Sequence, residues 1–203
     1  MAFDTDHLPT ILDHLWQHLG AATRSAKPPF HLPTLCSTDT EGLPRGRVVV
    51  LRRADRGSRT LICHTDRRAD KVQQFRHHPH AAWLFYDPPA KVQLRVTGPV
   101  TLHTEDALAD TQWAASTPSS RRCYLAPHPP GQLADEPSPN LPEAVRGRVP
   151  EPKETAAGRE NFAVISCTAE RFDWLYLHHT GHRRAQFEWT ASDPEPAMRW
   201  LEP

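Results

Sequence analysis

Residues 45–53 read RGRVVVLRR, with three valines and a leucine between two pairs of arginines. β-Branched residues favour extended backbone, and a run of them is typical of a strand that is buried on both faces. Turn-forming residues flank the run at 40–43 and at 55–58, with a glycine in each turn. The stretch therefore predicts a buried strand with a tight turn at each end.

Similar strand patterns recur along most of the chain. Consecutive strands with short turns between them favour an antiparallel sheet that curls into a barrel. We therefore expect a mainly β (α+β) fold. Besides 45–53, strands are predicted at 30–38, 60–65, 81–86, 91–102, 162–168, 172–178 and 183–189.

An amphipathic helix is predicted near the N-terminus, where apolar residues recur at helical spacing from Leu8 to Leu19. Gly20 and the two prolines at 28 and 29 are expected to end it. Shorter helices are predicted at 69–75, at 105–116 with Thr104 as the N-cap, and at 194–201.

Eight prolines crowd between Pro127 and Pro152, with few apolar residues among them. They predict a long loop at about 126–158, and loops of this length are usually lids, binding loops or disordered segments. The strand pattern resumes after the loop. We therefore expect residues 1–203 to form a single domain that carries this loop as an insertion.

The overall charge argues against some partners. Lys plus Arg and Asp plus Glu both number 24, so no net field draws the chain to nucleic acid or to a lipid surface. No apolar stretch approaches the length that spans a bilayer, and the acidic start is unlike a secretory signal. We expect a cytoplasmic protein with neither a nucleic-acid nor a membrane partner. The four cysteines are scattered, and three of them (Cys36, Cys63 and Cys167) are expected to be buried apolar residues.

Two segments are candidates for binding an anion. Alternate residues of a strand share a face, so Arg45 and Arg47 point together. At 65–71 a predicted strand gives way to a helix, and Thr65 with Lys71 beside a helix N-terminus suits a phosphate. The alternative is that these cations are simply solvated. Gln93, on one face of the strand at 91–102, indicates a polar cavity or a face that meets water.

Residues 172–187 read FDWLYLHHTGHRRAQF. Trp174 and Tyr176 share a strand face, and three histidines surround a glycine turn. Imidazole suits several transition metals, but no carboxylate or cysteine ligands accompany these histidines, so solvated turn residues are favoured and no metal is predicted. The arginines at 183 and 184 are further candidates for contacting an anion or a ring nitrogen. The common hydrolase, P-loop, Rossmann and zinc-protease signatures do not occur.

Taken in order, these segments resemble the pyridoxamine 5′-phosphate oxidase family. Residues 47–52 resemble its R-x-V-L-L-K strand, and His64-Thr65-Asp66 with Lys71 is similar to Y-T-N-x-x-S-R-K. Residues 93–98 resemble Q-V-R-I-x-G, and the tail resembles W…R-L-H-D-R and the closing W-x-x-x-R-L-x-P. The resemblance covers about 30–125 and 160–203. Residues 172–187 look more like a divergent, uncharacterised flavin-binding subgroup than like the oxidase itself.

The resemblance implies a split β-barrel of antiparallel strands with a few flanking helices, working as a homodimer with FMN at the subunit interface. It implies that Arg47 and Lys71 hold the FMN phosphate, with a hydroxyl from Thr65. Gln93 would bind the isoalloxazine edge, Trp174 and Arg184 would reach the flavin from the second subunit, and His182 would be catalytic. The residues expected to bind FMN are Arg47, Val48, Val49, Val50, Leu51, Arg52, His64, Thr65, Lys71, Gln93, Trp174 and Arg184.

Two positions depart from the family pattern. Asp70 stands where the family has a phosphate-binding arginine, although Arg52 offers a compensating charge. Thr180 stands where the family has a substrate-binding arginine. The favoured hypothesis is therefore an FMN-binding, flavin-dependent oxidoreductase that acts on an unidentified small molecule. The alternatives are pyridoxamine 5′-phosphate oxidase proper and a non-enzymatic protein that binds haem or flavin.

Overall fold

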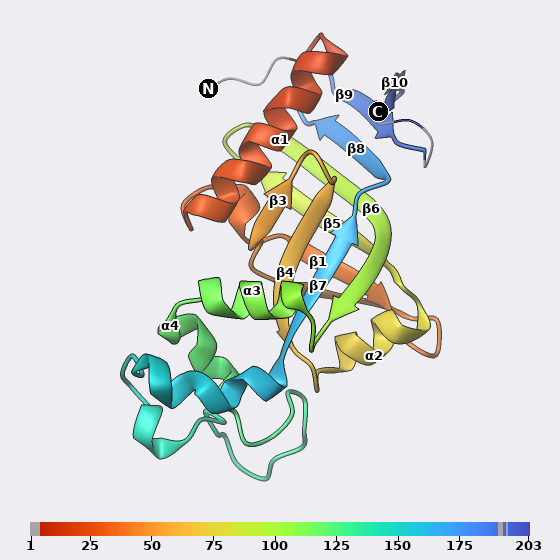
Figure 1. Cartoon of the computed structure of the whole chain (residues 1–203). Helices are drawn as coiled ribbons and strands as arrows, with labels where there is room; N and C mark the ends of the chain where they lie inside the picture. The colour runs from red at the N-terminus through yellow and green to blue at the C-terminus, as the bar shows by residue number, and fades with distance from the viewer. Residues whose placement is uncertain (1–4, 191–192, 194) are drawn as a thin grey trace.

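The computed structural model describes residues 5–190, 193 and 195–203. Within these residues ten antiparallel strands form one sheet that curls into a barrel, with helices around it (Figure 1). The predicted mainly β fold is confirmed. The strands are β1 (Thr34–Thr38), β2 (Pro44–Val48), β3 (Arg53–Asp55), β4 (Thr60–Asp66), β5 (His80–Asp87), β6 (Val92–His103), β7 (Phe162–Thr168), β8 (Arg171–Tyr176), β9 (Arg183–Glu188) and β10 (Ala197–Leu201). The helices are α1 (Leu8–Arg24), α2 (Asp70–His77), α3 (Ala107–Ala115) and α4 (Pro118–Arg121), with short 3-10 helices η1 (Pro29–His31), η2 (Arg122–Leu125), η3 (Glu143–Val145) and η4 (Pro152–Asn161).

Strand β6 joins the two parts of the sheet. Its first half pairs with β8, and its last residues, from Val100 to His103, pair with β7. Gly98 stands at the changeover, where a Cβ atom would lie 1.9 Å from the carbonyl oxygen of Thr168. Only glycine leaves room for this crossing, which gives a physical reason for the glycine that ends the motif at 93–98.

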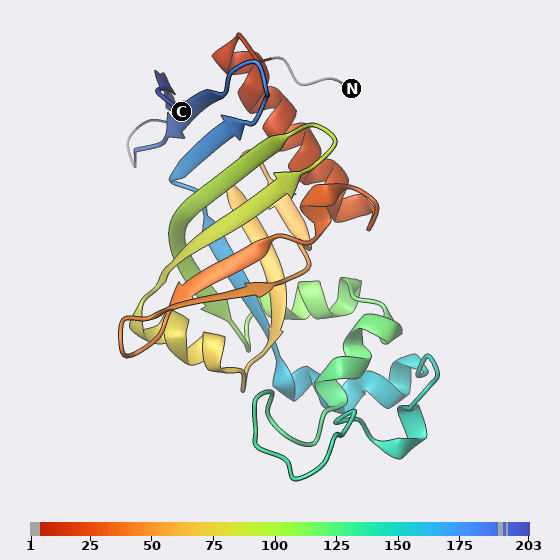
Figure 2. The same cartoon turned by 180° about the vertical axis from the view of Figure 1, so that it is seen from behind.

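Helix α1 covers one side of the barrel, as Figures 1 and 2 both show. Ile11, Leu15 and Leu19 are fully buried beneath it, and the Trp16 ring lies 5.0 Å from that of Phe172 on β8. The predicted amphipathic helix is confirmed, but it continues through Gly20 to Arg24, because Ala22 extends its buried stripe. No helix among the described residues has the length and apolar character that a membrane crossing needs.

Residues 45–53 do not form the single buried strand that their composition predicts. Strand β2 lies at the edge of the sheet, and the side chain of Val48 is 64% exposed. Beyond it the backbone N–H of Leu51 donates to the carbonyl of His31, while that of Arg52 donates to the carbonyl of Ile62 on β4. The stretch therefore crosses from β1 to β4, and of its apolar residues only Leu51 is fully buried.

The end of the chain also differs from expectation. Residues 197–201 form strand β10, which pairs with β9, and not the predicted helix; position 194, where that helix was to begin, lies outside the described residues. The strand is favoured because Trp200 packs edge-on against Trp174, with ring centroids 6.4 Å apart. Helix α3 is capped by Asp106, whose carboxylate accepts from the Ala109 N–H over 3.0 Å, and not by Thr104.

The proline-rich segment is the insertion of the barrel, here defined as residues 126–161. It has no regular secondary structure up to Pro142, as predicted, but η3 and η4 follow. The whole segment gathers with α4 beyond one end of the barrel (Figures 1 and 2). The amide of Asn140 holds both backbone polar groups of His128, accepting from its N–H over 3.2 Å and donating to its carbonyl over 2.8 Å. This clamp closes the loop on itself.

Candidate functional site

A cavity of about 360 Å³ lies where β2 ends, β4 meets α2, and η2 begins the path to the insertion. Most of the residues predicted to bind FMN line it. They are Arg47, Val48, Val49, Val50, Arg52, His64, Thr65 and Lys71. Leu51 does not join them, because its side chain is fully buried in the core.

Arg47 is held in the cavity by neutral groups. Its guanidinium donates to the carbonyl of Leu35 over 3.1 Å, to the hydroxyl of Ser37 over 2.7 Å, and to the side-chain oxygen of Gln74 over 2.9 Å. Burial lowers the pKa of Arg47 below its usual value. The side chain is thus fixed in place while its charge is left without a carboxylate partner among the described residues.

Lys71 is the second cation of the cavity. Its ammonium donates to the Thr65 hydroxyl over 3.2 Å. Burial and then the positive charge of Arg47 lower the pKa of Lys71 below its usual value. Two half-buried cations, one of which lowers the pKa of the other, form a site that an anion stabilises.

Asp70, which stands where the family has an arginine, is absent from the lining of the smaller cavity. It lines an adjoining cavity of about 680 Å³, which Arg47 and Lys71 also line. Arg52 does line the smaller cavity. The substitution therefore removes a cation and places a carboxylate in the cavity next to the smaller one, where Arg47 and Lys71 lie between the two.

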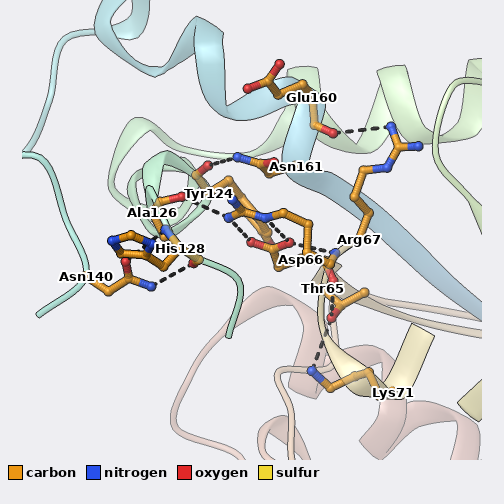
Figure 3. A network of polar contacts seen from close by, with 11 residues as sticks. Thr65, Asp66, Arg67, Lys71, Tyr124, Ala126, His128, Asn140, Glu160 and Asn161 are labelled. Atoms are coloured by element: carbon orange, nitrogen blue, oxygen red, sulfur yellow. Dashed lines mark hydrogen bonds and ion pairs between the residues drawn. The ribbon is translucent and has the colours of Figure 1, made fainter. Parts of the chain in front are cut away.

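The insertion forms one wall of the cavity, a feature that the sequence did not predict. Pro130 of the insertion lines both cavities, and Tyr124 of η2, just before the insertion, lines the smaller one. Figure 3 shows the polar network that ties this wall to the junction of β4 and α2. Arg68 binds both carboxylate oxygens of Asp66, over 3.0 and 2.7 Å, and also the carbonyl of Ala126 over 2.9 Å. The Asp-x-Arg spacing at 66–68 was a usable signal, whereas nothing marked Tyr124 or Pro130.

His64 lies in the cavity wall. Its Nε2 is 3.1 Å from the side-chain oxygen of Gln112 on α3, and its ring meets Phe162 edge-on. Burial lowers the pKa of His64 to about 4, so the imidazole is neutral at physiological pH.

Gln93 and Arg184, which were also predicted to bind FMN, lie in a different part of the sheet. Gln93 on β6 is paired with Leu175 on β8, and Leu175 is paired with Arg184 on β9, so the three side chains share one face. The strand order places five steps between β2 and β9. At about 4.8 Å a step, roughly 24 Å of sheet separates Arg184 from the strand that carries Arg47.

Trp174 does not share that face. Its indole is fully buried in the core, next to Tyr176 in the same stack and to Trp200. Because successive residues of a strand point to opposite faces, Leu175 occupies the position beside Arg184 that was assigned to Trp174. The predicted contact of Trp174 with a ligand therefore does not agree with the register of β8.

His182 borders a third cavity, of about 420 Å³, which Arg184 also lines. His178 turns to the hydroxyl of Thr180, 2.7 Å away, and stacks on Tyr176. Among the residues that the structure describes, no three histidine, cysteine, aspartate or glutamate side chains gather as a metal site would require.

Comparison with known proteins bears on this geometry. The model of the pyridoxamine 5′-phosphate oxidase FMN-binding domain matches residues 11–104. These residues belong to that family. The stretch contains every predicted ligand of the smaller cavity, and FMN is the cofactor that the match assigns to the chain.

Curated relatives match the same half of the chain. A pyridoxine/pyridoxamine 5′-phosphate oxidase of Azorhizobium caulinodans is 36% identical over 96 residues, which are 47% of this chain and 44% of that protein. The oxidase of Pseudomonas putida is 33% identical over 92 residues, 45% of this chain and 42% of that protein. The chain thus spans less than half the length of the curated oxidases that it matches.

Solved structures extend the likeness of fold to the whole chain. A pyridoxamine 5′-phosphate oxidase-related, FMN-binding protein of Nostoc punctiforme has a TM-score of 0.70 at 22% identity, covering 94% of this chain and 96% of that one. PhzG of Burkholderia lata, solved with tetrahydrophenazine-1-carboxylic acid, has a TM-score of 0.71 at 18% identity, covering 98% and 95%. The split-barrel fold of this family is therefore present.

The cavity fits one end of FMN. A phosphate needs cations and hydrogen-bond donors around it, and Arg47, Lys71 and Thr65 provide them in the smaller cavity. Asp66 is the carboxylate in the lining of that cavity, whereas Asp70 lines the adjoining one. The carboxylate of Asp66 is bound by Arg68, so its charge is neutralised locally. The valines at 48–50 offer an apolar strip next to the cations, as a ring system requires.

Proposed function

We propose that this protein is an FMN-dependent oxidoreductase that acts on a small molecule, and that each flavin site is built by two subunits. The observation that carries the proposal is the pair Arg47 and Lys71, two half-buried cations without a carboxylate partner inside the FMN-binding region. In this proposal they hold the FMN phosphate as charge-assisted donors, and Thr65 adds its hydroxyl.

The separation of the predicted ligands supports a homodimer. Gln93 and Arg184 lie several strands away from the cavity on the same chain, so one flavin bound in the cavity would not meet them there. A second copy would bring its own Gln93 and Arg184 to the open side. Two exposed apolar side chains of β5, Leu84 and Tyr86, lie on the sheet between these two regions and would be covered by that copy.

The bound FMN would supply the hydride or electron transfer, which side chains alone do not provide. The residues of this chain would fix the phosphate, orient the ring along Val48–Val50 and shield it from water behind the insertion. His182 and Arg184 border one cavity, which makes them the proposed groups beside the substrate. We also propose that residues 1–203 form one domain, since buried residues from α1 to Trp189 share a single core.

The substrate is proposed to differ from pyridoxamine 5′-phosphate. Thr180, at the position of the family's substrate-binding arginine, carries no charge and is hydrogen-bonded to His178. A phosphorylated amine would lose one charge-assisted contact there. Release of hydrogen peroxide from pyridoxamine 5′-phosphate and oxygen would contradict this part of the proposal.

Titration of the purified protein with FMN tests the phosphate assignment. Lys71→Ala should abolish saturable binding, measured by quenching of flavin fluorescence and by the visible spectrum. Lys153→Ala is the matched control, because Lys153 is an exposed lysine of η4 that does not line the cavity. Equal FMN affinity in both variants would refute the assignment of Lys71.

A further inference from the structure

We propose that Asp173 is a positioning residue, which fixes Arg95 and Arg184 as a rigid pair of cationic donors facing the flavin ring. The proposal rests on the two-subunit flavin site of the preceding section. It adds Asp173 and Arg95 to that site, and it states what holds Arg184 in place.

Asp173 lies on β8 and is 8% exposed. Arg184 donates to both of its carboxylate oxygens, from Nε over 3.1 Å and from Nη2 over 2.7 Å. Arg95 donates to the carboxylate from the opposite strand, over 2.5 Å. Burial by itself would raise the pKa of Asp173, but the hydrogen bonds from Arg184 and Arg95 bring it below the usual value. The carboxylate is therefore ionised, and it accepts from both arginines.

The register explains why these residues meet. Arg95 and Asp173 are directly opposite in the β6–β8 ladder. On β9 the residue opposite Asp173 is Gln186, and Arg184 lies two residues away, opposite Leu175. All of them share the face of Gln93. A fork of this kind restricts each guanidinium to one orientation, whereas a free arginine on an open sheet face samples many.

The charges of the group do not cancel. One carboxylate serves two guanidinium groups, so one positive charge remains on a face where the Arg95 side chain is 48% exposed and that of Arg184 is 29% exposed. A group that gains electron density fits this surplus, and the polar edge of the flavin ring is such a group. The ligand class is a planar heterocycle that accepts electrons.

The sign of one mutational effect separates positioning from simple electrostatics. Asp173→Asn removes a negative charge, so a role through the field alone would tighten binding of the anionic FMN and raise its reduction potential. A positioning role predicts the opposite effect on FMN affinity and on the reduction potential, because the two arginines are no longer held in one orientation by the carboxylate. We expect FMN affinity to fall by roughly tenfold, as for a lost hydrogen bond to a charged group, and the reduction potential of bound FMN to drop.

Two further variants test whether the effect of Asp173→Asn comes from the orientation of the arginines. Arg184→Lys keeps the charge but not the fork, and should resemble Asp173→Asn. Glu188→Gln is the matched control: Glu188 lies on the same face, accepts from Arg171 and Arg199, and binds neither Arg95 nor Arg184, so its FMN affinity should stay within about twofold of the wild type. Thermal unfolding without FMN shows whether each variant is folded.

The experiment uses the full chain saturated with FMN, with affinity read from flavin fluorescence and potential from equilibrium redox titration. Tighter binding or a higher potential in a folded Asp173→Asn protein would overturn the positioning role. Unchanged FMN binding in Arg184→Lys would overturn it as well. If Lys71→Ala also binds FMN like the wild type, the proposed flavin site itself has failed; if Lys71→Ala loses FMN, only the inference about Asp173 has failed.

Discussion

The ammonium of Lys71 donates a hydrogen bond to the hydroxyl of Thr65 over 3.2 Å, across the turn that joins β4 to α2. The contact holds a half-buried lysine in the first turn of α2, one residue after the helix begins. Lys71 gains no carboxylate from it, so the geometry of the cation is fixed while its charge stays available.

Removing the Thr65 hydroxyl should therefore weaken FMN binding without unfolding the protein. Thr65→Val keeps the shape of the side chain, and we expect the dissociation constant for FMN to rise roughly tenfold because a hydrogen bond to a charged group is lost. Thr60→Val, at the other end of β4, is the control and should bind FMN normally. Fluorescence titration measures both; equal affinities would show that the hydroxyl does not matter.

The fork between Arg68 and Asp66 should determine how firmly the insertion is held. Arg68→Met leaves Asp66, 8% exposed, without its charged partner and releases the carbonyl of Ala126. We expect a loss of about 2–3 kcal/mol in the free energy of unfolding and faster trypsin cleavage at Arg146 and Arg148.

The neighbouring Arg67→Met is the control for that variant. Its partner Glu105 is 75% exposed, and such pairs contribute about 0–1 kcal/mol. Its hydrogen bond to the carbonyl of Glu160 in the insertion is long, at 3.4 Å. Urea unfolding and timed proteolysis compare the two proteins. Similar behaviour of both variants would mean that the fork does not anchor the insertion.

Gly98→Ala should be among the most damaging single changes in the barrel. The added methyl would lie 1.9 Å from the carbonyl oxygen of Thr168, and the obstacle is backbone that has little room to move. We expect a cost of roughly 3 kcal/mol or more, or no folded protein. Gly46→Ala, where the nearest atom lies at 3.5 Å, should fold normally, as judged by circular dichroism and thermal unfolding. A stable Gly98→Ala protein would contradict the close crossing of β6.

His64 predicts how stability depends on pH. Burial, with a further contribution from Arg52, lowers its pKa to about 4 in the folded state, below the ordinary value of 6.5. Between these values the unfolded chain binds the proton and the folded chain does not, so stability is present above pH 6.5 and falls as the pH is lowered towards 4. The full effect is on the order of 3 kcal/mol.

Urea midpoints at pH 7 and pH 4.5 test this prediction. The wild type should lose more stability between the two than His64→Gln, which lacks the buried imidazole. Parallel losses in the two proteins would show that another group controls the acid sensitivity.

The sequence was informative where periodicity and turns dominate, and less so where the chain changes partners. The helix at Leu8 and most strands were predictable because buried residues repeat at regular spacing. The run at 45–53 was misjudged because its valines suit any extended chain. Composition does not distinguish a central strand from an edge strand that continues into a crossing segment. Its position depends on hydrogen bonds to His31 and Ile62, which no local pattern encodes.

The candidate site was predictable in part for a related reason. Motif matching located Arg47, Thr65 and Lys71, and the structure gathers them around one cavity. It did not anticipate the burial of Trp174, because a match of residue types carries no information on the strand register, which puts Leu175 on the face of Arg184. The wall formed by the insertion could not be predicted from the sequence. The position of Pro130 depends on the contact between His128 and Asn140, which lie twelve positions apart.

The distance between the cavity and Arg184 on one chain has a genetic consequence. If each flavin site takes its cavity from one copy and its arginine face from the other, a Lys71→Ala chain and an Arg184→Ala chain damage opposite halves. Neither homodimer would hold an intact site. A mixed dimer would hold one doubly damaged site and one intact site, so co-expression of the two defective alleles should restore flavin binding to about half of the sites in the hybrid. Such complementation between alleles distinguishes a shared site from two independent ones.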